Sequence, residues 1–428
     1  MKGDFTCVTF RPERRYRRVY MQQGRAQLDA DFNEQVDISE HLISALGQDV
    51  IGSSGAAASS FQVLLSSPRE LRILPGRMYV DGKLCVLDSE MLYTQQRDLP
   101  GAVVPSGDPV DTTRIPYLVY LDVWERHVSA LEDPALREVA LQGADTCSRA
   151  QLLTQVKLLR LTTDVTSTAA AAWDNQPEWR ALTTSAPGRL TITLDAAGYQ
   201  GHENQLYRVE IHDTQGADIY YKWSRDNGSV CAKVTLTAER QVTLDTLPRD
   251  EYSTFVSGQR VELIDEACEL AGRPGLIALL TRSENQDLQF DIEATPRAPT
   301  FQVGQRLLLR RWEGFGKTTA GTALRLERGI NAQFSAGVLR PGDYWQAPAR
   351  ELSHDVTWPK EQTRPFAPLA IPPRGVRHSY ARLAKVYLSQ NQLVQIIDLR
   401  QLFISNTDIV AELNDIKRRL ALLESKVP

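Results

Sequence analysis

Most of the chain beyond residue 60 consists of short segments in which apolar and polar residues alternate, and turn dipeptides separate these segments. Alternation with a period of two is typical of strands that bury one face. The segments LTITLD, LYRVEIHD and IYYKW show this alternation. Asp81-Gly82 and Asn227-Gly228 are dipeptides that readily adopt the positive φ angles of tight hairpin turns. The sequence therefore predicts a mainly β chain with a few helices (α+β), built from β-sandwich-like or barrel-like domains.

One pattern occurs twice in the second half of the chain. Phe255–Leu263 and Phe301–Leu309 both read F-x-x-G-Q-R, followed by Val or Leu, any residue, and Leu. A solenoid needs at least about three repeats, so two copies do not indicate one. We expect each copy to form the entry into a strand of a barrel or sandwich.

Two helices are expected in the first 150 residues. The first runs from a capping residue, Asp29, to a stop at Gly47. Its apolar residues at helical spacing are Phe32, Val36, Ile43 and Leu46. The second helix has Asp133 as its cap, proline at its first position and Gly143 after its last turn.

Two blocks of opposite charge adjoin each other near the N-terminus. Residues 1–25 are rich in arginine, whereas residues 26–50 contain six acidic residues and no Lys or Arg. The simpler interpretation is a solvated strand or turn that the acidic helix neutralises. The alternative is a basic docking arm for an acidic partner.

The most regular local pattern is an apolar stripe at the end of the chain. Its members recur at alternating spacings of four and three residues, as in a coiled coil: Ile409, Leu413, Ile416, Leu420, Leu423 and Val427. A helix this short has little stability of its own, so we expect the stripe to contact a partner. Leucine at a positions and isoleucine at d positions favour three or four strands over two. The sequence thus predicts self-association as a homotrimer, with packing onto its own β domain as the alternative.

These patterns divide the chain into five segments. An N-terminal arm and helix are expected in residues 1–60, and a β-rich domain with one helix in residues 61–161. Residues 162–189 are rich in Thr, Ala and Pro without a sustained period, which indicates a linker. Residues 190–405 are expected to form one or more β-rich domains with the repeated strand entry, and residues 406–428 the C-terminal coiled-coil helix.

The sequence shows no assembled set of catalytic residues. Its six histidines lack the spacings of zinc enzymes and its five cysteines never form C-x-x-C, so we expect no enzyme activity, no cofactor and no metal. A net charge of −4 disfavours general nucleic-acid binding, and no apolar run is long enough to span a membrane. Trp223, Tyr344 and Trp345 are candidates for a surface-binding aromatic face, although aromatic residues in strands more often lie in a core.

Several longer strings stand out over most of the chain: MKGDF, YMQQGRAQLDADFNEQ, PGRMYVDG, YLDVWERHVSALEDPALREVALQGADT, GHENQLYRVEIHD, KWSRDNGSV and GDYWQAPAR. Together they resemble an uncharacterised family that is encoded in gene clusters for phage-tail-like contractile injection systems. The resemblance implies a structural component of the particle, at the baseplate or in a fibre-like appendage, with other baseplate or tail proteins as partners. It implies no known enzyme activity.

The start of the chain has no apolar stretch of signal-peptide length, so we expect synthesis and assembly in the cytoplasm as part of such a particle. Two alternative functions stay open at this point. One is a carbohydrate- or surface-recognition module of the particle. The other is a cell-wall hydrolase that the particle carries.

Overall fold

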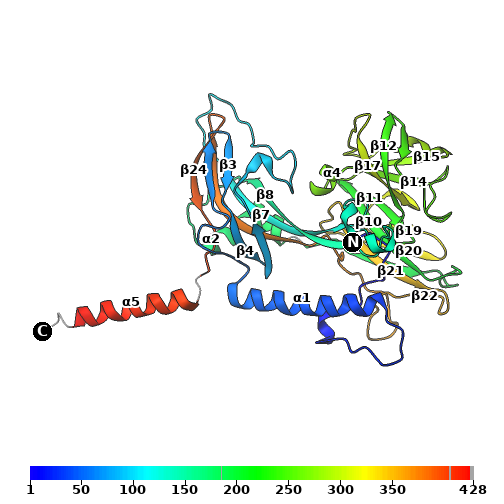
Figure 1. The fold of residues 1–428 in the computed structure, drawn as a ribbon, viewed down its shortest axis with the longest axis horizontal. Coiled ribbons are helices and arrows are strands. Elements are labelled where there is room, and N and C mark those ends of the chain that lie inside the picture. The colour runs from blue at the N-terminus through cyan, green and yellow to red at the C-terminus, as the bar shows by residue number, and fades with distance from the viewer. Residues whose placement is uncertain (185, 404–405, 425–428) are drawn as a thin grey trace.

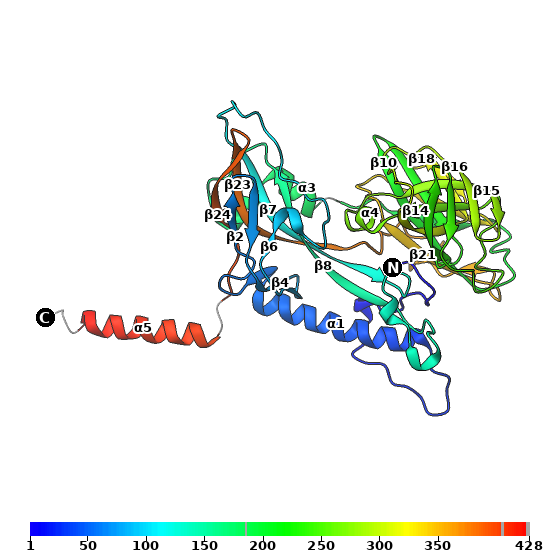
Figure 2. The same cartoon turned by 45° about the horizontal axis from the view of Figure 1, so that its top comes forward.

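The computed structural model describes residues 1–184, 186–403 and 406–424 of the protein. Two β lobes lie next to each other, and a long ribbon of strands connects them (Figure 1). Helix α1 (Asp29–Ile51) runs along one side of this ribbon from the first lobe towards the second. Helix α5 (Asn406–Glu424) projects away from the lobes beyond the end of α1 in both views (Figures 1 and 2). The prediction of a mainly β chain with few helices is confirmed.

The first lobe contains three antiparallel sheets around one core, with Leu71, Val119 and Leu383 fully buried in it. In strand order the sheets are β24-β23-β7-β8, β1-β4-β5 and β2-β3-β6. Their strands are β1 (Ser54–Ala56), β2 (Val63–Ser67), β3 (Glu70–Ile73), β4 (Gly76–Val80), β5 (Lys83–Leu87), β6 (Met91–Leu92), β7 (Ile115–Val128), β8 (Arg149–Arg160), β23 (His378–Ser389) and β24 (Gln392–Asp398). The long antiparallel pair β7 and β8 makes up much of the ribbon that leads to the second lobe.

The structure corrects two of the expected domain borders. Strands β23 and β24 belong to the first lobe, because β23 pairs with β7 along its length, so residues 190–405 do not form a separate unit. Residues 162–189 are more than a linker, since they contain α2 (Ala170–Asp174) and α3 (Pro177–Thr183). Trp173 and Trp179 of these helices are buried against Leu118 and Tyr120 of β7.

The second lobe combines a closed barrel with two open sheets. The five-stranded sheet has the order β18-β11-β10-β21-β22, and a three-stranded sheet has the order β19-β20-β9. Their strands are β9 (Leu190–Leu194), β10 (Gln205–Gln215), β11 (Asp218–Ser224), β18 (Gly314–Thr318), β19 (Ala323–Arg325), β20 (Ile330–Phe334), β21 (Tyr344–Arg350) and β22 (Asp355–Val356). The barrel has the order β12-β13-β16-β15-β14-β17. Its strands are β12 (Cys231–Ala238), β13 (Gln241–Leu244), β14 (Arg260–Ile264), β15 (Leu276–Glu284), β16 (Asp287–Ile292) and β17 (Arg306–Trp312), with α4 (Glu266–Leu270) after β14.

The repeated F-x-x-G-Q-R pattern forms two equivalent strand entries, as the sequence predicts. Gly258 and Gly304 have φ angles of 87° and 89°, which favour glycine. Gln259 accepts a hydrogen bond from the backbone N–H three residues before it at 3.0 Å, and Gln305 does the same at 3.0 Å. The strands that follow, β14 and β17, are antiparallel neighbours in the barrel. The pattern therefore encodes a turn that starts a barrel strand.

Helix α1 differs from the prediction at both ends. It continues through Gly47 to Ile51, and a Cβ at Gly47 would lie 2.9 Å from the Cα of Gly82. Glycine is required there because the helix touches the β4–β5 hairpin, not because the helix ends. At its start, Asp29 accepts hydrogen bonds from the backbone and hydroxyl of Thr6 and so holds the arm.

The predicted helix over residues 133–143 is wrong. Asp133 does accept a hydrogen bond from the N–H of Ala135, but only the short 3-10 turns Pro134–Leu136 and Val139–Leu141 form. Val139 and Leu141 are exposed, so no apolar face is buried to stabilise a longer helix. No helix among the described residues is both long and apolar enough to cross a membrane.

The two turn dipeptides have the expected backbone but different roles. Asp81 and Gly82 have φ angles of 48° and 76° and join the hairpin strands β4 and β5. Asn227 and Gly228 have φ angles of 56° and 63°, yet they lead from β11 in the five-stranded sheet to β12 in the barrel. The second turn therefore joins two sheets and closes no hairpin.

Candidate assembly surface and buried polar junction

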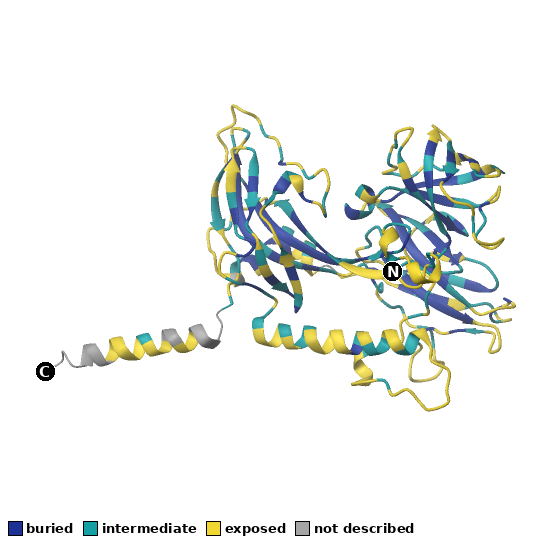
Figure 3. Cartoon of the chain, viewed as in Figure 1, coloured by how far each residue is buried: buried dark blue, intermediate teal, exposed yellow. Residues whose placement is uncertain are grey.

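The outer face of α1 is an exposed apolar stripe, which we call the α1 stripe. It consists of Phe32, Val36, Ile43, Leu46 and Val50, whose side chains are 48–75% exposed. At about 100° per residue, these positions fall within about 80° of one another around the helix axis. Figure 3 shows α1 mostly in the colour of exposed residues. An apolar helix face is normally buried, so the exposure of the α1 stripe makes it a candidate assembly surface.

The opposite face of α1 is already occupied by the same chain. Ile38 is buried, and Gln48 donates a hydrogen bond to the carbonyl of Asp81 at 3.2 Å. Towards the other end, the hydroxyl of Thr9 donates to the carboxylate of Glu34 at 2.5 Å. These contacts set the rotation of α1 and turn the α1 stripe away from the lobes.

Helix α5 carries the second exposed stripe, which we call the α5 stripe. Ile409, Leu413, Ile416 and Leu420 are 46–52% exposed, and the helix extends away from both lobes (Figure 3). The predicted helix is confirmed, and the alternative of packing onto its own β domain is not what the structure has. Val427 and the side chain of Leu423 lie outside the described residues. Assembly of α5 into a coiled coil stays a prediction.

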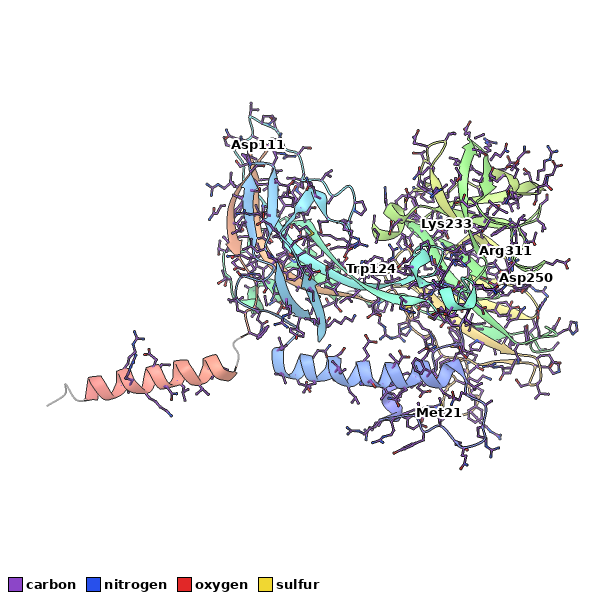
Figure 4. The ribbon with its side chains drawn as sticks, in the orientation of Figure 1. Met21, Asp111, Trp124, Lys233, Asp250 and Arg311 are labelled. Carbon is purple, nitrogen blue, oxygen red and sulfur yellow. The ribbon has the colours of Figure 1, made fainter. Side chains whose placement is uncertain are left out.

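The loop before α1 is strongly basic, and we call residues 11–25 the arginine loop. Residues 12–18 and 20–25 are exposed, and Figure 4 shows Met21 on the side of α1 that faces away from the lobes. The backbone N–H of Val19 donates to Gln35 of α1 at 2.8 Å. Within residues 1–184, 186–403 and 406–424, no ion pair joins an arginine of this loop to an acidic residue of α1. The arginine loop is solvated, as the simpler interpretation expects, but the described residues of α1 do not neutralise it through ion pairs.

A buried polar junction lies where the five-stranded sheet meets the barrel. Lys222 of β11 donates to both carboxylate oxygens of Glu262 of β14, at 2.6 and 2.7 Å, and lies 3.2 Å from Glu210 of β10. Lys2 reaches Glu210 at 3.6 Å, and the indole N–H of Trp312 donates to Glu262 at 3.0 Å. These charged groups are buried but paired, as buried charges must be.

The electrostatics of the junction keep both carboxylates ionised. Burial alone would raise the pKa of Glu210, but the charges of Lys2, Lys222 and Arg208 hold that pKa well below its usual range. Burial would likewise raise the pKa of Glu262, but Lys222 above all lowers it to about 2. Burial lowers the pKa of His212 to about 4, and Lys222 adds to this effect, so the imidazole is neutral. The junction is a set of buried ion pairs in which Glu210, Glu262 and His212 all have a pKa well below neutrality. Both ring nitrogens of His212 lack a hydrogen-bond partner among the described residues.

Comparison with known protein families gives one match. Residues 1–177 and 168–390 match the model of a family described as "Family of unknown function (DUF6519)". The chain belongs to this family. No curated protein and no solved structure matches it. The matched residues include α1, the polar junction and both lobes apart from β24, and they end before α5.

In this DUF6519 protein, four strings that are far apart in the sequence meet at the junction: MKGDF, GHENQLYRVEIHD, KWSRDNGSV and GDYWQAPAR. The side chain of Asn227 donates to the carbonyl of Gly3 at 2.9 Å and accepts from Gln346 at 3.0 Å. The guanidinium of Arg208 lies 3.7 Å from the ring centroid of Tyr344. The strings therefore join the N-terminal arm to the five-stranded sheet and the barrel.

The three candidate surface-binding aromatics do not form an exposed face, so that expectation is wrong. Trp345 is 1% exposed, Trp223 is 8% exposed, and both belong to the core of the second lobe. Tyr344 is half-buried under Arg208. The alternation of strands β11 and β21 points both tryptophans inward, where burial of their large rings stabilises the sheets.

The hollows on the described surface of the lobes include two of similar size. One, of about 200 Å³, is lined by Arg340, Asp343 and Arg377 together with proline, valine and glycine residues. Burial raises the pKa of Asp343 to about 6. The lining contains no histidine, cysteine or serine, and the second hollow, of about 210 Å³, contains none either. Among the described residues, no group of three or more His, Cys, Asp or Glu is placed to hold a metal ion.

The sequence contains signals for both sites that the prediction missed. The α1 stripe recurs at helical spacings of four, seven, three and four residues, but spacing does not show which face of a helix lies outward. The junction is signalled by β10, where Arg208, Glu210 and His212 alternate with apolar residues. Polar residues on one face of a strand predict that this face is exposed to solvent, but in β10 the barrel covers it.

Proposed function

We propose that the protein is a non-enzymatic structural component of a phage-tail-like contractile injection particle and assembles as a homo-oligomer, most simply a homotrimer. The observation that supports assembly is the exposure of the α5 stripe, together with that of the α1 stripe. The link to the particle rests on the sequence strings and their resemblance. In this proposal the protein lies at the baseplate or in a fibre-like appendage and contacts other baseplate or tail proteins.

Physical chemistry favours a partner for α5. Most of the stability of a helix in a protein comes from burying its apolar face, and not from the intrinsic propensity of its residues. No described residue of the α5 stripe is buried within the chain. Burial of apolar side chains contributes about 25 cal/mol per Å², so association of several α5 stripes is favourable. With leucine at a and isoleucine at d, three or four helices fit better than two.

The lobes suit a structural role. They are β bodies whose buried ion pairs serve packing, and the linings of the two hollows described above contain no histidine, cysteine or serine. A closed symmetric oligomer repeats one interface, as the rings and trimeric appendages of tail-like particles require. Several copies also raise the avidity of weak contacts to a target surface. These arguments support the proposal, and the following experiments test it.

The solution mass should depend on the α5 stripe. The mass of the full chain measured by light scattering is expected to be three times 48.0 kDa. Replacing Leu413 and Leu420 by aspartate should give a mass near 48.0 kDa, because charges in the seam of a helix bundle cannot be buried unpaired. Light scattering coupled to size exclusion measures both.

The matched control adds the same two aspartates outside the stripe, as Asn414→Asp with Arg418→Asp. This control should keep the mass of the full chain. A full chain that is monomeric at every concentration, or a stripe variant that keeps the oligomeric mass, would contradict assembly through α5.

Association with the particle can be tested by sedimentation. A tagged full chain is expected to move with assembled phage-tail-like particles in a density gradient, and Leu413→Asp with Leu420→Asp should leave it among the free proteins. The reason is that a monomer loses the avidity of several copies. If the unaltered chain stays among the free proteins while particles sediment, the particle assignment is wrong.

A further inference from the structure

The arginine loop and α1 carry opposite net charges, and both are exposed. The loop contains six arginines and one glutamate, a balance of +5, whereas α1 contains six acidic residues and no Lys or Arg. Neither charge is compensated by ion pairs between the two segments within one copy. A basic surface and an acidic surface that form no ion pairs with each other within one copy are electrostatically complementary between two copies.

The arginine loop also carries apolar groups that match the α1 stripe. Tyr16, Tyr20 and Met21 are exposed among the arginines. The guanidinium of Arg18 lies 5.2 Å from the ring centroid of Tyr20, which extends the flat surface of that ring. Tyrosine and arginine are the residue types that are enriched at the centres of protein interfaces.

Acidic residues border the α1 stripe on both sides. At about 100° per residue, Asp31 and Asp49 lie on one side of the stripe and Glu40 on the other. Burial raises the pKa of Glu40, and the neighbouring charges of Glu125 and Asp37 raise it further. These borders make contact between two α1 stripes unfavourable, because the acidic residues of both helices would face each other.

We propose that the arginine loop of one copy docks on the α1 stripe of a second copy, with its arginines beside Asp31, Glu40 and Asp49 and its tyrosines on the apolar residues. Within one copy, the backbone of Val19 is already bound to Gln35, and both surfaces still remain exposed. Each copy offers one loop and one stripe, so the contact is head-to-tail, and it closes into a ring when the copies are arranged around the axis that α5 sets. This inference rests on the proposed function in that α5 sets the copy number, and it adds a second, lateral contact between the same copies.

Charge reversal tests the contact in the full chain. The loop variant replaces four arginines by glutamate: Arg14, Arg15, Arg17 and Arg18. The helix variant is Glu40→Lys with Asp49→Lys, and a lysine near the end of a helix favours the helix. Each variant alone should raise the concentration at which the oligomer dissociates at least about tenfold, because each places like charges in contact. An equimolar mixture of the two should restore association in part, because the loop of one variant and the stripe of the other carry opposite charges. In a mixed ring of three copies, two of the three contacts are then complementary.

The control reverses four exposed arginines of the barrel lobe, which changes the net charge by the same amount and should leave dissociation unchanged: Arg240, Arg249, Arg282 and Arg306. If neither the loop variant nor the helix variant alters dissociation while the α5 variant does, the lateral contact is wrong and the proposed function stands. If the loop and helix variants alter dissociation of the oligomer while the α5 variant does not, assembly through α5 is wrong and the lateral contact stands. If the loop variant weakens association and the mixture does not restore association at all, the contact between the loop and α1 is wrong. The loop would then bind another acidic partner.

Discussion

Replacing Lys222 by methionine is expected to lower the free energy of unfolding by about 3–5 kcal/mol. The substitution keeps the length of the side chain and removes the charge that neutralises Glu262 and Glu210, both of which are buried. Glu262 would then lose its closest cation, whereas Glu210 keeps Arg208 at 2.6 Å and Lys2 at 3.6 Å. Urea unfolding monitored by tryptophan fluorescence measures the change.

The matched control is Lys317→Met on the neighbouring strand β18. Lys317 also pairs with an aspartate, Asp218 at 2.7 Å, but both side chains are partly exposed to solvent, so the cost should be much smaller than that of Lys222→Met. The variant Lys222→Met with Glu262→Gln should recover part of the loss, because it removes the unpaired charge. Equal costs for Lys222→Met and Lys317→Met would contradict a buried ion pair.

Acid provides a second readout for the same pair. The pKa of Glu262 is about 2 in the folded protein against an ordinary value of 4.5. Its stabilising contribution is therefore complete above about pH 4.5 and is lost as the pH falls towards about 2. Without Lys222, burial raises this pKa instead, so the difference in stability between the unaltered protein and Lys222→Met should shrink as the pH falls through this range.

Replacing Trp345 by alanine is expected to cost about 3–5 kcal/mol. The indole is almost fully buried, its N–H donates to the carbonyl of Ile371 at 2.9 Å, and its ring meets Phe334 at 5.7 Å between centroids. The substitution leaves a large cavity between the five-stranded sheet and β20, and it leaves the carbonyl of Ile371 without this donor. Thermal unfolding should show a clear drop in midpoint.

Trp345→Phe should retain most of the stability, because it preserves most of the buried ring. Leu352→Ala is the exposed control, since Leu352 is 93% exposed and its loss should change the free energy of unfolding by less than about 0.5 kcal/mol. If Trp345→Ala were as stable as Leu352→Ala, the ring would lie on the surface, and the carbohydrate-recognition alternative would regain its aromatic face.

Several parts of the fold can be predicted from the chain because their causes are local. The paired glycines 258 and 304 with the glutamines that follow them form the same turn wherever they occur, and alternation in β10 and β11 identifies strands. Turn dipeptides predict backbone angles correctly at Asp81-Gly82 and Asn227-Gly228, because positive φ is a property of those residues. What such a turn connects depends on which sheet each strand joins, and β11 and β12 join different ones.

By itself the sequence determined the secondary structure class, the two apolar stripes and the two opposite charge blocks, all of which are periodic or compositional properties of neighbouring residues. Only the tertiary structure decided that β23 completes the first lobe, that Lys222 and Glu262 are buried and that the α1 stripe faces outward. Each of these depends on contacts between segments more than thirty residues apart, such as β4–β5 against Gly47 or β14 against β11. The free energy of such contacts comes from excluding water between distant surfaces, and no local pattern contains it.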